Sequence, residues 1–185
     1  MLMMSAVHAA VDCDVRLGGT VGRRLDKCVR NQLEATDAMR LARVFADKDE
    51  SSRWQTEFWG KYMHSAVPFA RYFDSAILRK SVDESTAFVR ATQLADGYIG
   101  NYREKKRGAA NTWDVWGVKY TLLGLLYHYD LTGDGKSLQA ACRLADWLIG
   151  RFGDGRLDIA KSGCHCGTAS CSVLEPIVWL YRITS

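Results

Sequence analysis

The chain contains 185 residues with a mass of 20.7 kDa, a length that suffices for one domain with a hydrophobic core. Hydrophobic residues make up 48% of the sequence, and no stretch approaches the roughly 20 consecutive apolar residues that cross a bilayer, so no membrane anchor is implied. The formal charge of +4 is spread along the chain apart from one basic run at residues 103–107, which predicts a solvated loop and no nucleic-acid partner.

Residues 1–14 form an N-terminal segment that we assign to no domain. Residues 1–10 are weakly apolar, but they lack the basic start and the full apolar run of a signal peptide. The localisation therefore stays open between cytoplasm and periplasm.

The first predicted helical hairpin spans residues 59–94. Apolar side chains between positions 59 and 70 recur at i, i+3, i+4 and i+7, the spacing of one buried helical face. We expect this helix to bend at Pro68, because proline lacks the N–H of the helical ladder. A second helix is predicted over residues 77–94, closed by a turn at Asp96-Gly97.

The same arrangement recurs in a second predicted hairpin at residues 118–149. Residues 118–131 are apolar on nearly every side, residues 132–135 make a turn, and residues 137–149 are amphipathic. We therefore expect the first helix of each hairpin to be enclosed and the second to face water. Because strand-type alternation is scarce, the predicted fold class is all-α.

A third unit begins after the glycine-rich loop at residues 163–167. Ser172 and Glu175 have the spacing of a capping box at the start of a helix. The helix starts near Trp59, Trp116 and Val173 are separated by 57 positions each, a period typical of arrays of helix pairs. We expect an inner and an outer ring of helices whose open ends expose apolar faces and favour self-association.

Five motifs follow one another along the chain. They are WQTEFWGK at residues 54–61, DGYIGNY at 96–102, WDVWGVKY at 113–120, YDLTGD at 129–134 and LEPIVWLYR at 174–182. Together they resemble the β-L-arabinofuranosidase-type glycoside hydrolases of family 127, from about Val15 to Arg182. The resemblance implies that residues 15–185 form an incomplete (α/α)6 toroid of the six-hairpin type, roughly the first half of the ring.

The resemblance also implies a carbohydrate ligand, drawn from plant or microbial oligosaccharides, with L-arabinofuranosides as candidates. Family members use a cysteine thiolate held on zinc and a glutamate acid/base, both downstream of the motif that ends at Arg182. We therefore expect these 185 residues to be inactive alone and to contain no cofactor, zinc belonging to the full-length family. The family's His-Glu-Leu-Tyr motif is replaced here by residues 116–120, which leaves the arabinoside specificity open.

Candidate sugar-binding residues lie at the starts of the predicted inner helices, where flat indole faces stand beside charged groups that bond to hydroxyls. Without the resemblance, ordinary core tryptophans beside solvated charges would be the favoured interpretation. With it, we expect sugar contacts from Trp54, Glu57, Trp59, Lys61, Trp113, Asp114, Trp116 and Lys119. Trp54, Glu57, Trp113 and Trp116 should lie close together on one rim.

Three cysteines crowd near the C-terminal end, at Cys164, Cys166 and Cys171. A Cys-His-Cys string invites a zinc interpretation, but ligands one residue apart strain a tetrahedral site and no second ligand pair follows. The prediction is therefore reduced loop cysteines and no metal site.

Two other functions remain compatible with the sequence. A sugar epimerase or lyase on the same toroid would require catalytic histidines on inner helices, and the chain has four histidines in all. A helical-repeat interaction scaffold would use an extended concave face and have no affinity for sugars.

Overall fold

The computed structural model describes residues 15–185, and the unassigned segment 1–14, with Cys13, lies outside the described residues. All regular structure in the described range is helical, and strand-like pairing there is confined to isolated bridges. The all-α prediction is confirmed. None of the helices between residues 15 and 185 is long and apolar enough to cross a membrane.

The helices follow one another from α1 to α8, with short turns of other helical types between them. The α-helices are α1 (Gly19–Cys28), α2 (Ala38–Arg43), α3 (Glu57–Phe73), α4 (Ala76–Ala91), α5 (Asp114–Thr132), α6 (Gly135–Arg151), α7 (Thr168–Cys171) and α8 (Leu174–Thr184). The shorter turns are η1 (Val29–Leu33), η2 (Glu104–Lys106) and η3 (Ile159–Lys161).

The two predicted hairpins are present as α3 with α4 and α5 with α6. Buried residues lie on nearly every side of α5, whereas those of α6 lie along one side only, and α3 is likewise more enclosed than α4. The prediction of enclosed first helices and solvated second helices is therefore confirmed. Pro68 lies within α3 without ending it, and the helix stops where Asp74 adopts a left-handed conformation with φ of 49°.

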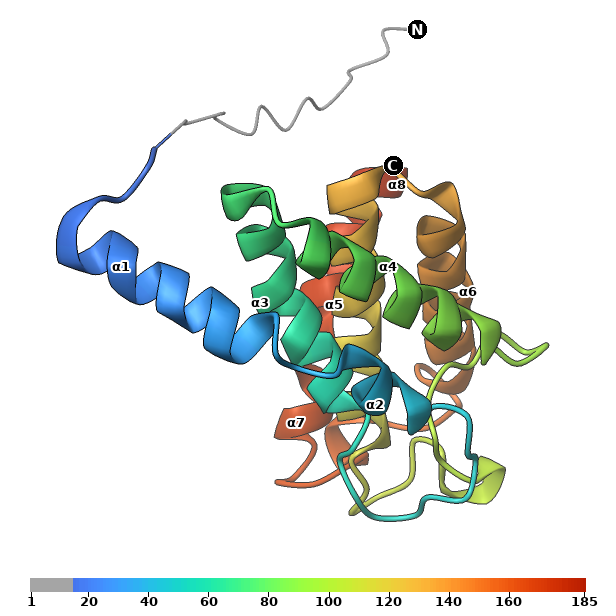
Figure 1. Cartoon of the computed structure of the whole chain (residues 1–185). Helices are drawn as coiled ribbons and strands as arrows, with labels where there is room; N and C mark the ends of the chain where they lie inside the picture. Colours follow the sequence, from blue (N-terminus) through green and yellow to red (C-terminus); the bar gives the residue numbers. More distant parts are fainter. Residues whose placement is uncertain (1–14) are drawn as a thin grey trace, which may run out of the picture.

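Helix α5 is the centre of the bundle. It contacts α3, α4, α6, α7 and α8, and Figure 1 shows it between α3 and α6 with α4 crossing in front. Its central side chains Leu122, Leu125 and Leu126 are fully buried. These five helices are therefore arranged around one apolar element.

Helices α3 and α5 approach closely because glycine stands where they meet. A Cβ atom at Gly60 would lie 2.1 Å from the carbonyl oxygen of Tyr120, and one at Gly124 would lie 2.4 Å from the indole of Trp59. Both separations are far below van der Waals contact. No side chain separates the α3 backbone from α5 at Gly60, and the contact leaves no room for one.

A buried polar network joins α4, α5 and α6 around His128. One ring nitrogen of His128 lies 3.1 Å from Asp83 Oδ1, and the other lies 2.8 Å from Ser137 Oγ. Arg90 donates to the Ser137 hydroxyl at 3.0 Å and pairs with Asp134. Because a carboxylate oxygen only accepts, the ring proton lies on Nε2 toward Asp83, and in the neutral ring Nδ1 then accepts from the Ser137 hydroxyl.

One local prediction is wrong and a second fails at one residue. Ser172 does not cap α8, because its hydroxyl donates to the carbonyl of Ala169 at 2.6 Å and the helix begins after Val173 without a side-chain cap. Residues 103–106 of the basic run are exposed as predicted, but Arg107 is 8% exposed, donates to the carbonyl of Tyr102 and stacks on the ring of Tyr98.

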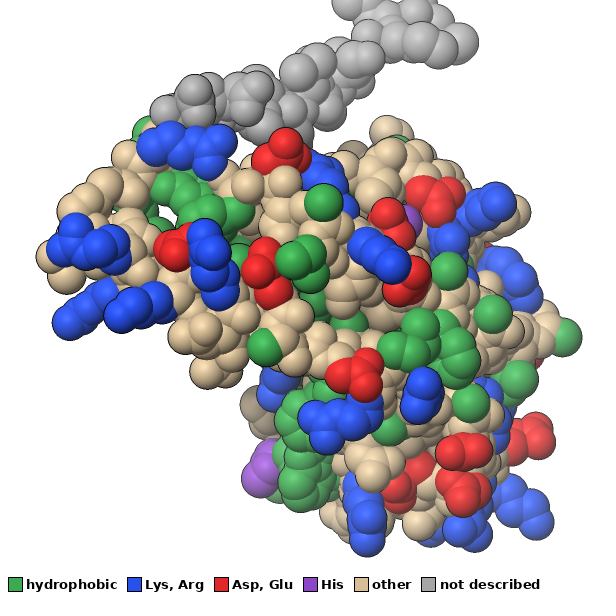
Figure 2. All heavy atoms as spheres, in the orientation of Figure 1, with side chains coloured by type: hydrophobic (Ala, Val, Ile, Leu, Met, Phe, Trp, Pro, Cys, Tyr) green, Lys and Arg blue, Asp and Glu red, His purple; other side chains and the backbone are tan. Residues whose placement is uncertain are grey.

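Helix α1 contributes little to this core. It buries none of its residues and projects from the body of the molecule in Figure 1, and Figure 2 shows basic side chains gathered in this region. The chain reaches the body again at Val29, which is 3% exposed in η1. The amide of Leu17 also donates to the hydroxyl of Tyr72 at 2.7 Å.

The close contact of α3 and α5 generates a stability prediction. We expect Gly60→Ala to lower the free energy of unfolding by about 2 kcal/mol or more, because the added methyl group meets backbone that cannot move aside. The control is Gly150→Ala in α6, where nothing lies within 4 Å and the better helix former should add up to about 1 kcal/mol. Urea unfolding followed by circular dichroism measures both, and equal stability of the two variants would contradict the packing argument.

Candidate functional site

Three connecting segments gather at one end of the bundle, where α3 and α5 begin. They are residues 44–56 before α3, residues 92–113 before α5 and residues 152–173 before α8, and they lie together at the lower end of Figure 1. Isolated bridges join Glu50 to Tyr102 and Ala110 to Gly163. The starts of successive inner helices are thus tied to one another through their preceding loops.

Aromatic side chains at this end form a continuous cluster, which we call the aromatic rim: Trp54, Trp113, Trp116 and Tyr120. Ring centroids are 5.8 Å apart for Trp54 and Trp113, 6.0 Å for Trp113 and Trp116, and 5.1 Å for Trp116 and Tyr120. Trp54 is 49% exposed and the other three are half-buried. His165, from the cysteine loop, packs its ring edge to face with Trp113 at 5.4 Å.

Two ion pairs stand beside the rim. Glu57 accepts from Lys61 at 2.7 Å through one carboxylate oxygen and from the indole N–H of Trp116 through the other. Lys119 pairs with Glu175 at 3.0 Å. Since Glu57 bonds directly to Trp116, the prediction that Trp54, Glu57, Trp113 and Trp116 lie together is confirmed.

The two lysines also flank the rim aromatics. Lys61 Nζ lies 5.7 Å from the Trp116 ring centroid and 5.1 Å from that of Tyr120, and the corresponding distances for Lys119 are 5.3 and 5.1 Å. Cations at these distances are attracted to the ring faces. The rim therefore combines apolar ring surface with hydrogen-bonding groups whose charges are already balanced.

Three of the predicted residues are buried: Glu57, which is 6% exposed but contacts the rim, and Trp59 and Asp114, which lie in the core. Trp59 is 0% exposed, and its indole N–H donates to Ser85 at 3.1 Å while its ring packs against Phe45. Asp114 is 2% exposed and accepts from the Tyr98 hydroxyl at 2.6 Å and the Gly108 amide at 2.9 Å. Neither Trp59 nor Asp114 offers surface to a ligand, because Trp59 lies on the buried side of α3 and Asp114 is covered by Tyr98 and the Gly108 backbone.

Burial raises the pKa of Asp114 to about 6, although the hydrogen bonds from Tyr98 and Gly108 and the nearby Arg107 act in the opposite direction. Burial alone raises the pKa of the Cys164 thiol. The carboxyl of Asp114, beneath the rim, therefore takes up a proton at a higher pH than an exposed aspartate does.

Sequence reasoning missed Tyr120 and Glu175. Tyr120 is one helical turn beyond Trp116, so both rings lie on the same side of α5. The signal for Glu175 is a repeated acidic residue in the first turn of each inner helix, seen at Glu57 in α3, Asp114 in α5 and Glu175 in α8. Aligning the three helix starts would have revealed it.

The loop at residues 163–167 contacts the rim through His165, but its side chains do not form a set of metal ligands. Cys164, Cys166 and Cys171 are free thiols, and His165 and Cys166 adopt left-handed conformations with φ of 54° and 53°. In the range 15–185, no three His, Cys, Asp or Glu side chains are grouped so that they could hold a metal ion. These residues do not fit a zinc site.

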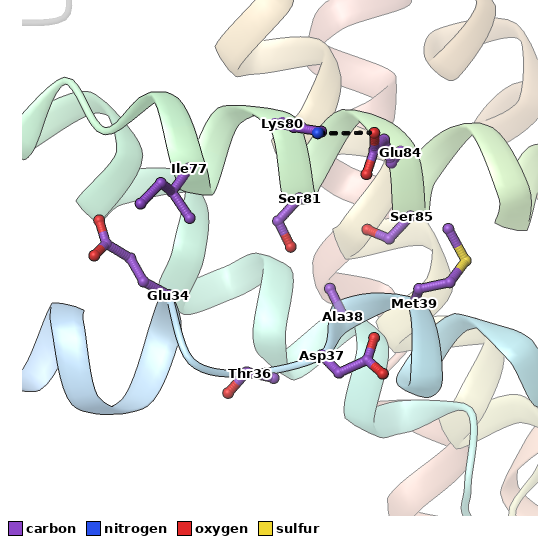
Figure 3. Close-up of a pocket in the computed structure, with 10 residues that line it drawn as sticks. All are labelled: Glu34, Thr36, Asp37, Ala38, Met39, Ile77, Lys80, Ser81, Glu84 and Ser85. Carbon is purple, nitrogen blue, oxygen red and sulfur yellow. Dashed lines mark ion pairs between the residues drawn. The ribbon is translucent and has the colours of Figure 1, made fainter.

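A separate cavity of about 380 Å³ lies between α4 and the segment that leads into α2, as Figure 3 shows. Its lining includes none of the predicted site residues. Several of its polar groups already have partners, since Ser85 accepts from Trp59, Ser81 from Tyr62 and Glu34 from Ser75. The lining residues are Glu34, Thr36, Asp37, Ala38, Met39, Ile77, Lys80, Ser81, Glu84 and Ser85.

Residues 15–185 match the family described as "Beta-L-arabinofuranosidase, GH127 catalytic domain". The chain belongs to this glycoside hydrolase family. A solved GH127 structure titled "The GH127, Beta-arabinofuranosidase, BT3674" is similar to it, with a TM-score of 0.56 and 19% sequence identity. The similarity covers 86% of this chain and 27% of the solved one, so the described helices correspond to part of a GH127 toroid. The comparison with curated protein sequences gave no match.

The contact between Glu57 and Trp116 gives this GH127 chain a testable property. We expect Glu57→Ala to lower the unfolding free energy by about 1–3 kcal/mol, because the half-buried Trp116 indole N–H loses its acceptor, and to shift tryptophan emission. The control is Glu84→Ala, whose partner Lys80 is 3.9 Å away and exposed, so the expected loss is below about 1 kcal/mol. Equal losses of unfolding free energy in urea titrations of the two variants would contradict a stabilising contact between Glu57 and Trp116.

Proposed function

We propose that residues 15–185 bind an oligosaccharide at the aromatic rim. The observation that supports this most is the contact of three indole rings, one of them half exposed, at the starts of two inner helices. Flat indole faces stack on the C–H groups of a sugar ring, and nearby carboxylate and ammonium groups bond to its hydroxyls. Trp54, Trp113, Trp116, Lys61 and Lys119 remain the proposed contacts, with Tyr120 added, whereas Glu57 is 6% exposed and is proposed to hold Trp116 and Lys61 in place.

Arabinofuranosyl oligosaccharides are the first ligands to test, because that sugar stands in the name of the family and of the solved relative. Family membership supports a glycoside hydrolase-like role over an epimerase or lyase. The interaction scaffold remains a rival, and it differs in having no sugar affinity at the rim.

We further propose that these 185 residues bind sugar without cleaving it. Retaining hydrolysis needs a nucleophile and an acid/base about 5 Å apart across the scissile bond. Glu57, the carboxylate that bonds to the rim, is already engaged by Lys61 and Trp116. From the resemblance we expect the family's own catalytic pair in later hairpins of the toroid.

The sugar-binding proposal is tested by calorimetry with arabinofuranosyl oligosaccharides. We expect Trp54→Ala to weaken binding by about threefold to tenfold, the loss of one stacking contact. The control is Phe58→Ala, since Phe58 is 45% exposed next to Glu57 but makes no ring contact with the rim. Equal effects of the two variants would remove the rim from the proposal, and no affinity for any oligosaccharide would favour the scaffold. Turnover of aryl glycosides that is lost on mutating the rim would overturn the binding-only role.

Self-association is a separate proposal that depends on α8. Leu174, Val178 and Tyr181 are 64%, 41% and 69% exposed and occur at i, i+4 and i+7, so they share one face of the helix. Contiguous apolar surface of this kind recruits a partner or aggregates. We expect light scattering to give a mass above 20.7 kDa for the purified chain, and Val178→Glu to return it to that of the monomer. A monomer at all concentrations would contradict this.

A further inference from the structure

Tyr102 lies directly beneath the rim, in the segment that precedes α5. Its side chain is 1% exposed, and its hydroxyl makes two hydrogen bonds to different parts of the chain. It donates to the carbonyl oxygen of Arg53 at 2.7 Å and accepts from the backbone N–H of Trp113 at 3.1 Å. One buried hydroxyl therefore joins the backbone just before Trp54 to the backbone of Trp113.

The neighbourhood of Tyr102 holds this hydroxyl in place. The backbone on either side of Tyr102 pairs with Glu50, through Glu50 N–H to Asn101 at 3.0 Å and Arg103 N–H to Glu50 at 3.0 Å. The amide of Tyr102 itself donates to the Tyr98 hydroxyl at 3.1 Å. Because the backbone of Tyr102 is fixed, its hydroxyl can hold the two tryptophan-bearing segments at a constant separation.

The protonation state of Tyr102 suits this arrangement. Burial raises the pKa of Tyr102 well above its ordinary value, so the phenol keeps its proton at physiological pH. The proton is needed for the bond to Arg53, and the oxygen lone pair is needed for the Trp113 amide. Phenylalanine would fill the same space and make neither bond.

We propose that Tyr102 is a positioning residue that sets the 5.8 Å spacing of Trp54 and Trp113 without touching the ligand. Sugar stacking depends on ring placement, so a shift of either segment would weaken binding while the helices stay folded. The consequence for sugar affinity rests on the proposed function, but the consequence for ring geometry does not.

The test compares Tyr102→Phe with Tyr62→Phe in the full chain. Tyr62 is a matched control because its buried hydroxyl donates to Ser81 at 3.1 Å between α3 and α4. The ring geometry is followed by near-ultraviolet circular dichroism, in which neighbouring indoles couple. The Trp54→Phe variant identifies the part of the spectrum that depends on the pair.

We expect Tyr102→Phe to lose the part of the spectrum that Trp54→Phe removes, and to raise the hydrogen-exchange rate of the Trp113 amide by about threefold to tenfold. Tyr62→Phe should change neither, although both variants lose one buried hydroxyl. In calorimetry, Tyr102→Phe should weaken oligosaccharide binding by a similar factor. A spectrum and an exchange rate like those of the unsubstituted chain would overturn the positioning role.

The spectroscopic measurements need no ligand, so they test Tyr102 even if no sugar binds and the proposed function fails. Should Tyr102→Phe not fold, 4-aminophenylalanine at position 102 replaces it, because this side chain keeps the donor to Arg53 and weakens the acceptor for Trp113. Faster hydrogen exchange of the Trp113 amide in this variant would support the positioning role of Tyr102, and an unchanged exchange rate would refute it.

Discussion

The close contact of α3 with α5 is the constraint on which the rest of the molecule depends. At Gly60 the backbone of α3 meets the carbonyl of Tyr120, and at Gly124 the Trp59 indole fills the space that a side chain would occupy. This contact fixes how far each inner helix slides along its neighbour. The positions of the loops before α3 and α5, and therefore of the tryptophans on them, follow from that register.

The three inner helices use the same first-turn acidic residue in different ways. Glu57 bonds to a rim indole, Asp114 is buried under the rim, and Glu175 pairs with Lys119 of the adjacent helix. Each carboxylate lies near a helix N-terminus, where the backbone N–H groups favour negative charge. The acidic residue thus recurs at the same place in each helix, and its local partners differ from helix to helix.

Much of the fold could be predicted from the sequence, because helical periodicity reports directly on burial. The apolar residues on nearly every side of 118–131 predicted that α5 is enclosed. The clustering of Trp54, Trp113 and Trp116 followed from their places near the starts of successive inner helices. The helical spacing placed Trp59 on the buried face of its helix, so the sugar contact expected from it conflicted with that pattern, and the structure follows the pattern. Ser172 misled for a different reason, because a serine hydroxyl can bond backward to Ala169 as readily as it caps a helix.

The network around His128 makes the stability of the fold depend on pH, and a second buried group, Asp114, acts in the opposite direction. Burial lowers the pKa of His128 below its ordinary 6.5, so as the pH falls the unfolded chain binds a proton at His128 before the folded chain does. The stability that neutral His128 contributes is therefore complete above about pH 6.5 and declines as the solution becomes more acidic. Asp114 behaves in the opposite sense, because its pKa is raised from 3.8 to about 6 and the folded chain is protonated first as the pH falls through that interval. Below about pH 6 the two titrations act against each other, one where α4, α5 and α6 meet and one beneath the rim. Mild acid therefore acts on these two regions of one fold with opposite signs.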